Sequence, residues 1–218
     1  MMRQEDIFRA TEGTAWLQRN AEKIGKRDPV TDAIRELKLK PKHVFEFGCS
    51  NGWRLKKLAD EFGCHAWGVD PSLEAIKEAP KRGSVNGEPT IWPSVGTASR
   101  TDAPDYLFDV VIYGFCLYVA DRDDLLRIAA EGDRLLTDGG HLIIHDFHTE
   151  KPHAVPYHHD IRLRTYKMDY ANLWLSNPAY SLAYRRVYGL GNNRTAVSAI
   201  KKNIASAYPL IPGGPIDA

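Results

Sequence analysis

The chain has 218 residues, a length that suits one domain with its own hydrophobic core and no need for cross-links. Because 29 basic side chains balance 28 acidic ones, the net charge of +1 gives no reason to expect a nucleic-acid partner. The three cysteines lack CxxC spacing, which argues against a disulfide framework and against a cysteine zinc site. No apolar run approaches the roughly 18 residues of a membrane span, so we expect no membrane partner.

The first part of the chain predicts helices. Phe8 and Trp16 belong to one helix that we expect to lie over the open end of a sheet. Asp28 and Pro29 have the residue types of a helix cap and a first helical residue, and the helix that they open runs through Ile34. The charged first residues do not resemble a signal peptide, so we expect a reduced, cytoplasmic protein.

The middle of the chain alternates short apolar runs with helical patterns, as in crossover units of a parallel sheet. Prolines 89 and 93 flank and interrupt the third run, which therefore belongs at an edge of the sheet. Asp121 is expected to cap the helix that follows the fourth run. The five predicted strands cover residues 44–47, 66–70, 90–95, 108–113 and 141–147.

The alternation ends after Phe147, where residues 148–162 are polar and rich in histidine. Arg164–Asp169 and Tyr180–Tyr188 predict two further strands, close enough in the chain to pair as an antiparallel hairpin. The stretch from about Thr195 is expected to form one helix.

A glycine loop, Glu46-Phe-Gly-Cys-Ser-Asn-Gly52, joins the first strand to the next helix. This is the crevice in which open α/β sheets bind ligands. Asp70 ends the second strand 22 residues after Gly48, a distance at which a carboxylate can accept from both hydroxyls of a ribose. Ser50 and Trp53 replace the second and third glycines of a dinucleotide fingerprint, so the loop favours a nucleoside without phosphates.

The motif series resembles that of class I S-adenosylmethionine-dependent methyltransferases, as found in small bacterial members. Four segments carry the likeness in the family's order: the glycine loop, Gly-Val-Asp-Pro-Ser, Phe-Asp-Val-Val-Ile and Leu-Leu-Thr-Asp-Gly-Gly-His-Leu-Ile-Ile. The resemblance implies a three-layer α/β/α sandwich around a seven-stranded, mostly parallel sheet of order 3-2-1-4-5-7-6, with the last strand antiparallel. It also implies helices in residues 1–42 that cover the cofactor site, and a methyltransferase domain over residues 43–218.

Carried over by position, the resemblance implies which residues hold S-adenosylmethionine, whose product is S-adenosylhomocysteine. The family often has an acid where Thr97 stands, so Thr97 or Asp102 would take over the contact to the adenine amino group. Asp70 would hold the ribose, and the strand end at 113–115 would line the pocket near the methyl group. The expected cofactor-binding residues are Glu46, Phe47, Gly48, Cys49, Ser50, Gly52, Asp70, Pro71, Ser72, Gly96, Thr97, Ala98, Tyr113, Gly114 and Phe115.

Methyl transfer to a hydroxyl needs a proton acceptor, and histidine has a suitable pKa near neutral pH. Five of the eight histidines lie between residues 145 and 159. The candidate catalytic residues are His145, Asp146, His148 and His159. His145 and Asp146 are neighbours on a strand and should point to opposite faces of the sheet. The same side chains could ligate a metal, but their spacing matches no strong metal motif, so we predict no metal site.

The sequence thus predicts O-methylation of a small polar acceptor, for which a sugar or sugar nucleotide is one class. An N- or C-methyltransferase of the same fold stays open as an alternative. So does a protein of another class, either a nucleotide-binding oxidoreductase or a non-catalytic binder. We expect a small-molecule substrate, and the sequence also allows a homodimer.

Overall fold

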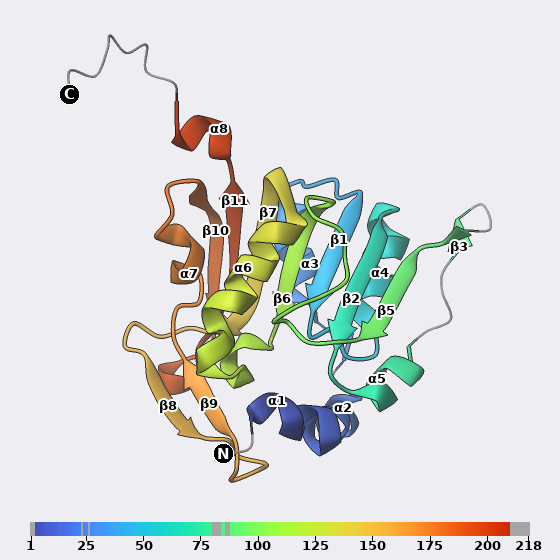
Figure 1. Ribbon diagram of the computed structural model, residues 1–218, viewed down its shortest axis with the longest axis vertical. Coiled ribbons are helices and arrows are strands. Elements are labelled where there is room, and N and C mark those ends of the chain that lie inside the picture. The colour runs from blue at the N-terminus through green and yellow to red at the C-terminus, as the bar shows by residue number, and fades with distance from the viewer. Residues whose placement is uncertain (1–2, 23, 26, 80–83, 86–87, 210–218) are drawn as a thin grey trace.

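A seven-stranded sheet forms the centre of the computed structural model, which describes residues 3–22, 24–25, 27–79, 84–85 and 88–209 (Figure 1). The strand order is β10-β11-β7-β6-β1-β2-β5, which is the predicted order 3-2-1-4-5-7-6. Neighbouring strands from β5 to β7 are parallel, whereas β11 is antiparallel to both β7 and β10. The strands are β1 His43–Phe47, β2 His65–Asp70, β5 Ile91–Val95, β6 Phe108–Gly114, β7 Leu136–Phe147, β10 Tyr180–Tyr188 and β11 Thr195–Lys202.

Helices cover both faces of this sheet and so give the expected three layers (Figure 1). On one face, Val30 and Ile34 of one helix and Leu55 and Leu58 of another pack against the strands. On the other face, Ile128 and Trp174 belong to a second buried cluster. Each fully buried apolar side chain of this kind contributes about 1.5–3 kcal/mol. The helices on the first face are α3 Pro29–Glu36 and α4 Trp53–Phe62, and those on the second face are α6 Leu125–Leu135 and α7 Asn172–Leu175. Two more helices are α5 Leu73–Lys77, at the bottom of Figure 1, and α8 Ile204–Ala207, near the end of the described chain.

Several local predictions are confirmed. The Asp28 carboxylate accepts from the backbone N–H of Val30 at the start of α3, with Pro29 as the first helical residue. The edge position of β5 is also as expected, because Pro93 there interrupts no hydrogen bonds to a further strand. None of the helices in the described ranges is long and apolar enough to cross a membrane.

The prediction for the last third of the chain was wrong in two respects. Thr195–Lys202 is not a helix but strand β11, which is inserted between β7 and β10. Residues 196–200 are all buried, since both faces of a central strand are covered, and small or branched side chains suit that position. Arg164–Lys167 (β9) does not pair with β10; it forms a separate two-stranded sheet with His153–Pro156 (β8).

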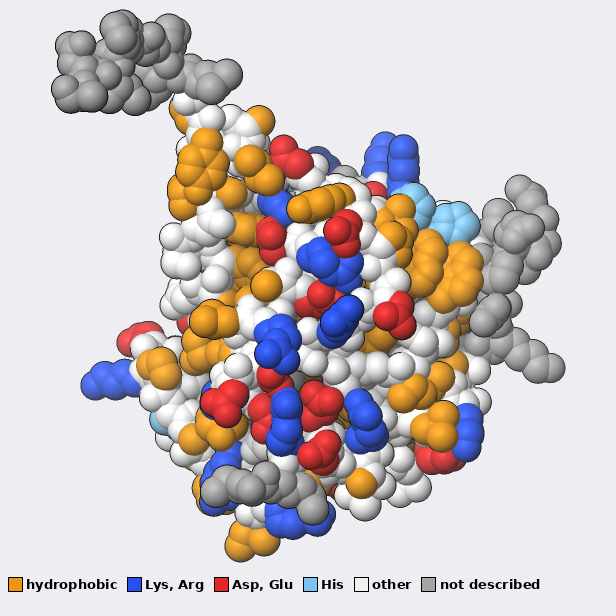
Figure 2. All heavy atoms as spheres, in the orientation of Figure 1, with side chains coloured by type: hydrophobic (Ala, Val, Ile, Leu, Met, Phe, Trp, Pro, Cys, Tyr) orange, Lys and Arg blue, Asp and Glu red, His pale blue; other side chains and the backbone are white. Residues whose placement is uncertain are grey.

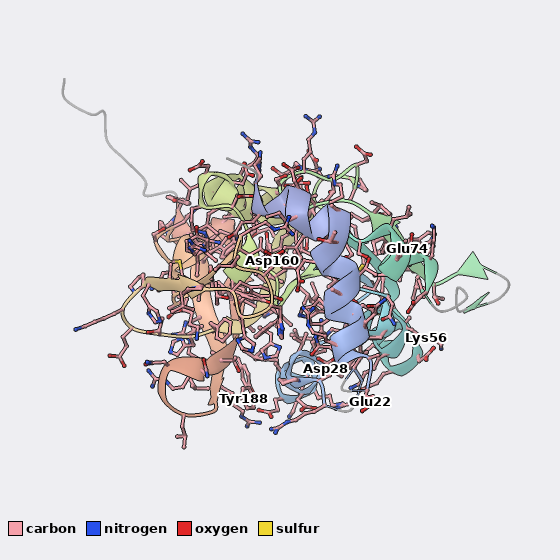
Figure 3. The ribbon with its side chains drawn as sticks, turned by 90° about the horizontal axis from the view of Figure 1, so that it is seen from below. Glu22, Asp28, Lys56, Glu74, Asp160 and Tyr188 are labelled. Carbon is pink, nitrogen blue, oxygen red and sulfur yellow. The ribbon has the colours of Figure 1, made fainter. Side chains whose placement is uncertain are left out.

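The N-terminal segment crosses the carboxyl ends of the parallel strands, as seen at the bottom of Figure 1 and from below in Figure 3. It consists of α1 Gln4–Ile7, a π-helical turn Phe8–Glu12, and α2 Gly13–Asn20. Asp121 does not cap the helix that follows it, as the sequence predicted. Its carboxylate instead accepts from the backbone N–H groups of Gln4 and Glu5, both at 3.0 Å, and so caps α1.

Candidate functional site

The glycine loop makes a tight turn between β1 and α4, with glycine at two positions of positive φ. Gly48 and Gly52 have φ values of +72° and +73°, the left-handed region that favours glycine. A Cβ on Gly48 would lie 2.8 Å from Cβ of Cys116, so a side chain has no room there. The N–H groups of Gly48 and Cys49 both donate to the carbonyl of Val69, which holds the loop against the end of β2.

Asp70 lies at the end of β2 with both carboxylate oxygens fixed. The backbone N–H of Ser50 donates to Oδ2, and that of Ser72 donates to Oδ1, each at 2.9 Å. Burial raises the pKa of Asp70, while these two backbone donors lower it. Each oxygen has a second acceptor position, so the carboxylate can take hydrogen bonds from two neighbouring hydroxyls.

A cavity opens beside this carboxylate, with about 890 Å³ of space free of atoms, part of it open to solvent. One wall comes from the N-terminal helices, through Phe8, Gly13 and Trp16. Cys116 and Tyr118, from the turn that follows β6, also line the cavity. Nine of the predicted cofactor-binding residues line the cavity, namely Gly48, Ser50, Asp70, Pro71, Gly96, Thr97, Ala98, Gly114 and Phe115.

The other predicted cofactor-binding residues lie behind the cavity wall. Tyr113 is fully buried, stacks on Phe47 with ring centroids 4.7 Å apart, and donates its hydroxyl to the carbonyl of Ile128. Ser72 caps α5. Glu46, Cys49 and Gly52 are the remaining residues of this group. They belong to the glycine loop but do not line the cavity.

Glu46 belongs to a buried charged triad that sequence reasoning missed. Arg54 donates to Oε1 of Glu46 through Nη1, and to Oδ1 of Asp28 through Nε at 3.0 Å. The second oxygen of Glu46, Oε2, is buried and has no hydrogen-bond partner among the described residues. Burial raises the pKa of Glu46 to about 7 even though Arg54 lowers it. The triad has one cation for two carboxylates, so Oε2 of Glu46 can accept a hydrogen bond from a further cationic donor.

Two hydroxyl groups lie at the part of the cavity wall where the sequence predicts the adenine contact. The Thr97 and Ser99 hydroxyls are 3.0 Å apart, and both residues line the cavity. The alternative acid, Asp102, is not among the lining residues. The structure thus offers Thr97 and Ser99, but not Asp102, at this wall.

The four candidate catalytic residues are not brought together, and none of them lines the cavity. Asp146 is buried, and its carboxylate accepts from the backbone N–H groups of Leu117, Tyr118 and Phe147, which fixes the turn after β6. Burial raises the pKa of Asp146 to about 7. These three backbone contacts give Asp146 a positioning role.

The three histidines lie at different places outside the cavity lining. His145 points to the opposite face from Asp146, with its ring 5.4 Å from that of Phe115; burial, with Arg54 nearby, lowers its pKa to about 4. His148 lies 3.9 Å from the carboxylate of Asp169, and His159 is exposed against the ring of Tyr157. Among the described residues there is no cluster of three or more ligating side chains that could hold a metal ion.

A second polar network joins the N-terminal helices to the β8–β9 hairpin. Glu12 is buried in the π-helical turn, and its Oε1 accepts from the Tyr157 hydroxyl at 2.7 Å and from Arg19. A π-helical turn closes i→i+5 hydrogen bonds, here from Gly13 to Phe8, and brings Ile7 and Glu12 to the same buried side. A polar residue in an apolar helical pattern was the only sequence signal for this contact.

Comparisons with known proteins agree on one type of domain. Residues 44–140 match the family model described as a methyltransferase domain. An uncharacterized protein of Haemophilus influenzae is 32% identical over 106 residues, which are 48% of this chain and 42% of that protein. Phosphoethanolamine N-methyltransferase 1 of Zea mays is 26% identical over 125 residues, 56% of this chain and 24% of that enzyme. The chain therefore spans less than half the length of these relatives.

Solved structures share the fold. A SAM-dependent methyltransferase of Methanosarcina mazei superposes with a TM-score of 0.65 at 19% identity, covering 81% of this chain and 98% of that one. The 1,6-didemethyltoxoflavin-N1-methyltransferase of Burkholderia thailandensis, solved with that substrate and S-adenosylhomocysteine, gives 0.69 at 14% identity, covering 93% and 91%. At these identities the likeness concerns the arrangement of helices and strands.

Proposed function

Since residues 44–140 match the model of a methyltransferase domain and the whole sheet has the class I arrangement, we propose that the chain transfers a methyl group from S-adenosylmethionine to a small polar acceptor. When bound, the sulfonium cofactor supplies a methyl carbon already activated for displacement. The protein has to bind both partners, exclude water and align them. One observation carries the proposal: the cavity combines the fixed Asp70 carboxylate with the loop opened by Gly48, and Oε2 of Glu46, which has no hydrogen-bond partner among the described residues, is buried behind the wall at Gly114.

Each part of the cofactor has a matching group that lines this cavity or lies directly behind its wall. Asp70 accepts from the ribose hydroxyls, and residues 96–98 face the adenine. Glu46 Oε2 accepts from the ammonium of the methionine part, next to Gly114, where a Cβ would collide with Glu46 and Arg54. The positive charge of that ammonium balances the excess carboxylate of the triad.

A hydroxyl is the proposed nucleophile of the acceptor, with sugars and sugar nucleotides as the class to test first. His145 supports this, because a histidine with a pKa of about 4 is unprotonated at neutral pH, and its ring lies against Phe115, which lines the cavity. The names of the maize and Burkholderia proteins favour a nitrogen nucleophile as the second candidate. A free amine would need no protein base.

The partners proposed are small molecules in the cytoplasm, and neither nucleic acid nor a membrane. The α6 face supports this, since basic and acidic side chains are interspersed on it rather than gathered by sign (Figure 2). Arg134, for example, is paired with Glu131 and Asp105. A homodimer remains compatible with the fold.

The test is an acceptor screen that follows production of S-adenosylhomocysteine. Hydroxyl acceptors should give product, and their amine analogues should give less. Turnover of amines alone would replace O-methylation by the second candidate. No turnover of any acceptor, together with no binding of S-adenosylhomocysteine, would leave only the non-catalytic or oxidoreductase alternatives.

A further inference from the structure

A cluster of basic side chains lies behind the aromatic wall of the cavity, where β7 ends. Two ring contacts connect it to the cofactor site. Phe115 lines the cavity, its ring lies 5.2 Å from that of Phe147, and Nζ of Lys167 lies 4.4 Å from the centroid of the Phe147 ring. Lys167 belongs to β9, and its hydrogen-bond partners Asn192 and Asn193 lie in the turn that joins β10 to β11. The cluster consists of His148, Lys167, Arg185 and Arg194.

Lys167 is a buried cation without a carboxylate partner among the described residues. Its side chain is on β9 and the residue is 6% exposed. The ammonium donates only to neutral acceptors, the carbonyl of Asn192 at 2.9 Å and Oδ1 of Asn193 at 2.8 Å. Burial of the ammonium lowers the pKa of Lys167. A buried ammonium of this kind is costly unless an anion compensates it.

Arg194 is the second group with unused hydrogen-bonding capacity. Its Nε atom is buried and finds no acceptor in the part of the chain that the structure describes. Its carbonyl accepts from the backbone N–H of His148 at 3.0 Å, so Arg194 and His148 lie side by side. The charge of Arg194 contributes to lowering the pKa of His148.

The acidic groups nearby do not neutralise this cluster. Asp169 is already engaged by Arg185, at 2.8 Å, and lies 3.9 Å from His148. Glu150 is exposed, and its charge raises the pKa of His148. The lysine and two arginines therefore outnumber the one carboxylate among them.

We propose that this cluster binds an anionic group, a phosphate or a carboxylate, carried by the methyl acceptor. The proposal rests on the proposed function and narrows its substrate class. The body of the acceptor lies against Phe115 and Phe147, with its nucleophile toward the cofactor. Its anionic group reaches Lys167, Arg194 and His148. A guanidinium and an ammonium are the donors that proteins use for such groups.

Inorganic phosphate and acetate are suitable probes, titrated separately into the full chain loaded with S-adenosylhomocysteine. The anion that matches the acceptor should bind more tightly than the other. Arg194→Gln and Lys167→Met should each weaken it by about tenfold or more, the effect of losing a hydrogen bond to a charged group. Arg186→Gln is the matched control, because it removes the same charge from an exposed side chain of β10 that pairs with Glu36. It should leave the binding unchanged.

The proposal is overturned if the wild type, Arg194→Gln and Lys167→Met bind each anion with the same affinity. It is also overturned if Arg186→Gln loses as much anion affinity as the other two variants. If Lys167→Met does not fold, the Arg194→Gln variant tests the proposal by itself. Arg194 is only partly buried, so we expect this variant to fold. The affinity for S-adenosylhomocysteine is measured on the same samples. Normal cofactor binding with no anion site refutes this inference alone. Anion binding without cofactor binding refutes the proposed function and, with it, the role of the cluster in holding an acceptor.

Discussion

The backbone N–H of Ser50 donates to Oδ2 of Asp70 at 2.9 Å, so the loop after β1 and the carboxylate that ends β2 form one preorganised unit. Ser50 adopts a positive φ of 52°, which points its N–H at the neighbouring strand. The rigidity of this unit underlies the first prediction.

Replacing Asp70 by Ala should weaken binding of S-adenosylhomocysteine by about 1.5–3 kcal/mol, because the ribose loses a charged hydrogen-bond acceptor. Isothermal titration calorimetry measures the change. Asp60→Ala is the control, since Asp60 is an exposed carboxylate on α4 that pairs with Lys56. An unchanged affinity in the Asp70 variant would show that the ribose is held elsewhere.

Replacing Arg54 by Met should lower the free energy of unfolding by about 3–5 kcal/mol, because the buried carboxylates of Asp28 and Glu46 lose their shared partner. Urea denaturation measures this change. Arg35→Met serves as the control: Arg35 pairs with Glu61 on the surface, where an ion pair is worth about 0–1 kcal/mol. A similar loss in both variants would contradict a special role for the triad.

Replacing Asp121 by Ala should release α1, because the N–H groups of Gln4 and Glu5 lose their acceptor. Amide hydrogen exchange in residues 4–12 should accelerate, with little change in the strands. Asp123→Ala is the control, since Asp123 is exposed on the same turn. Slow exchange at residues 4–12 in the Asp121 variant would mean that other contacts hold the N-terminal helices.

Replacing His145, His148 or His159 by Ala should spare cofactor binding and lower turnover about 10²–10⁴-fold for the one that is the base. The pH profile identifies which one. A base is active only when unprotonated, so activity is lost as the pH falls through its pKa. If His145 is the base, that loss occurs near pH 4. Full activity of all three variants on a hydroxyl acceptor would contradict histidine catalysis.

The central part of the fold could be predicted from the sequence because each strand and helix there carries its own local signal. Apart from Asp109, the run 108–113 is apolar because β6 is buried on both faces, and Asp28-Pro29 marks the start of α3 whatever the rest of the chain does. The sequence signal of the glycine loop is local as well. Two of its three positive φ angles, at Gly48 and Gly52, follow from residue type.

What could not be predicted depends on contacts between distant parts of the chain. Asp121 has the residue type of a cap, but the helix it caps begins 117 residues earlier. Thr195–Lys202 shows no alternation of polar and apolar residues, since its place between β7 and β10 buries both faces. The pairing of Arg54 with Glu46 and Asp28 likewise needs the fold, because charges give no sign of their partners in the sequence.

The most direct test of the central claim is the crystal structure of the chain grown with S-adenosylhomocysteine, with NAD⁺ used in a parallel experiment. We predict S-adenosylhomocysteine in the cavity, with both ribose hydroxyls on Asp70 and the methionine ammonium on Glu46, and no NAD⁺ there. A dinucleotide in the cavity, or a cavity without S-adenosylhomocysteine at saturating concentration, would contradict the account.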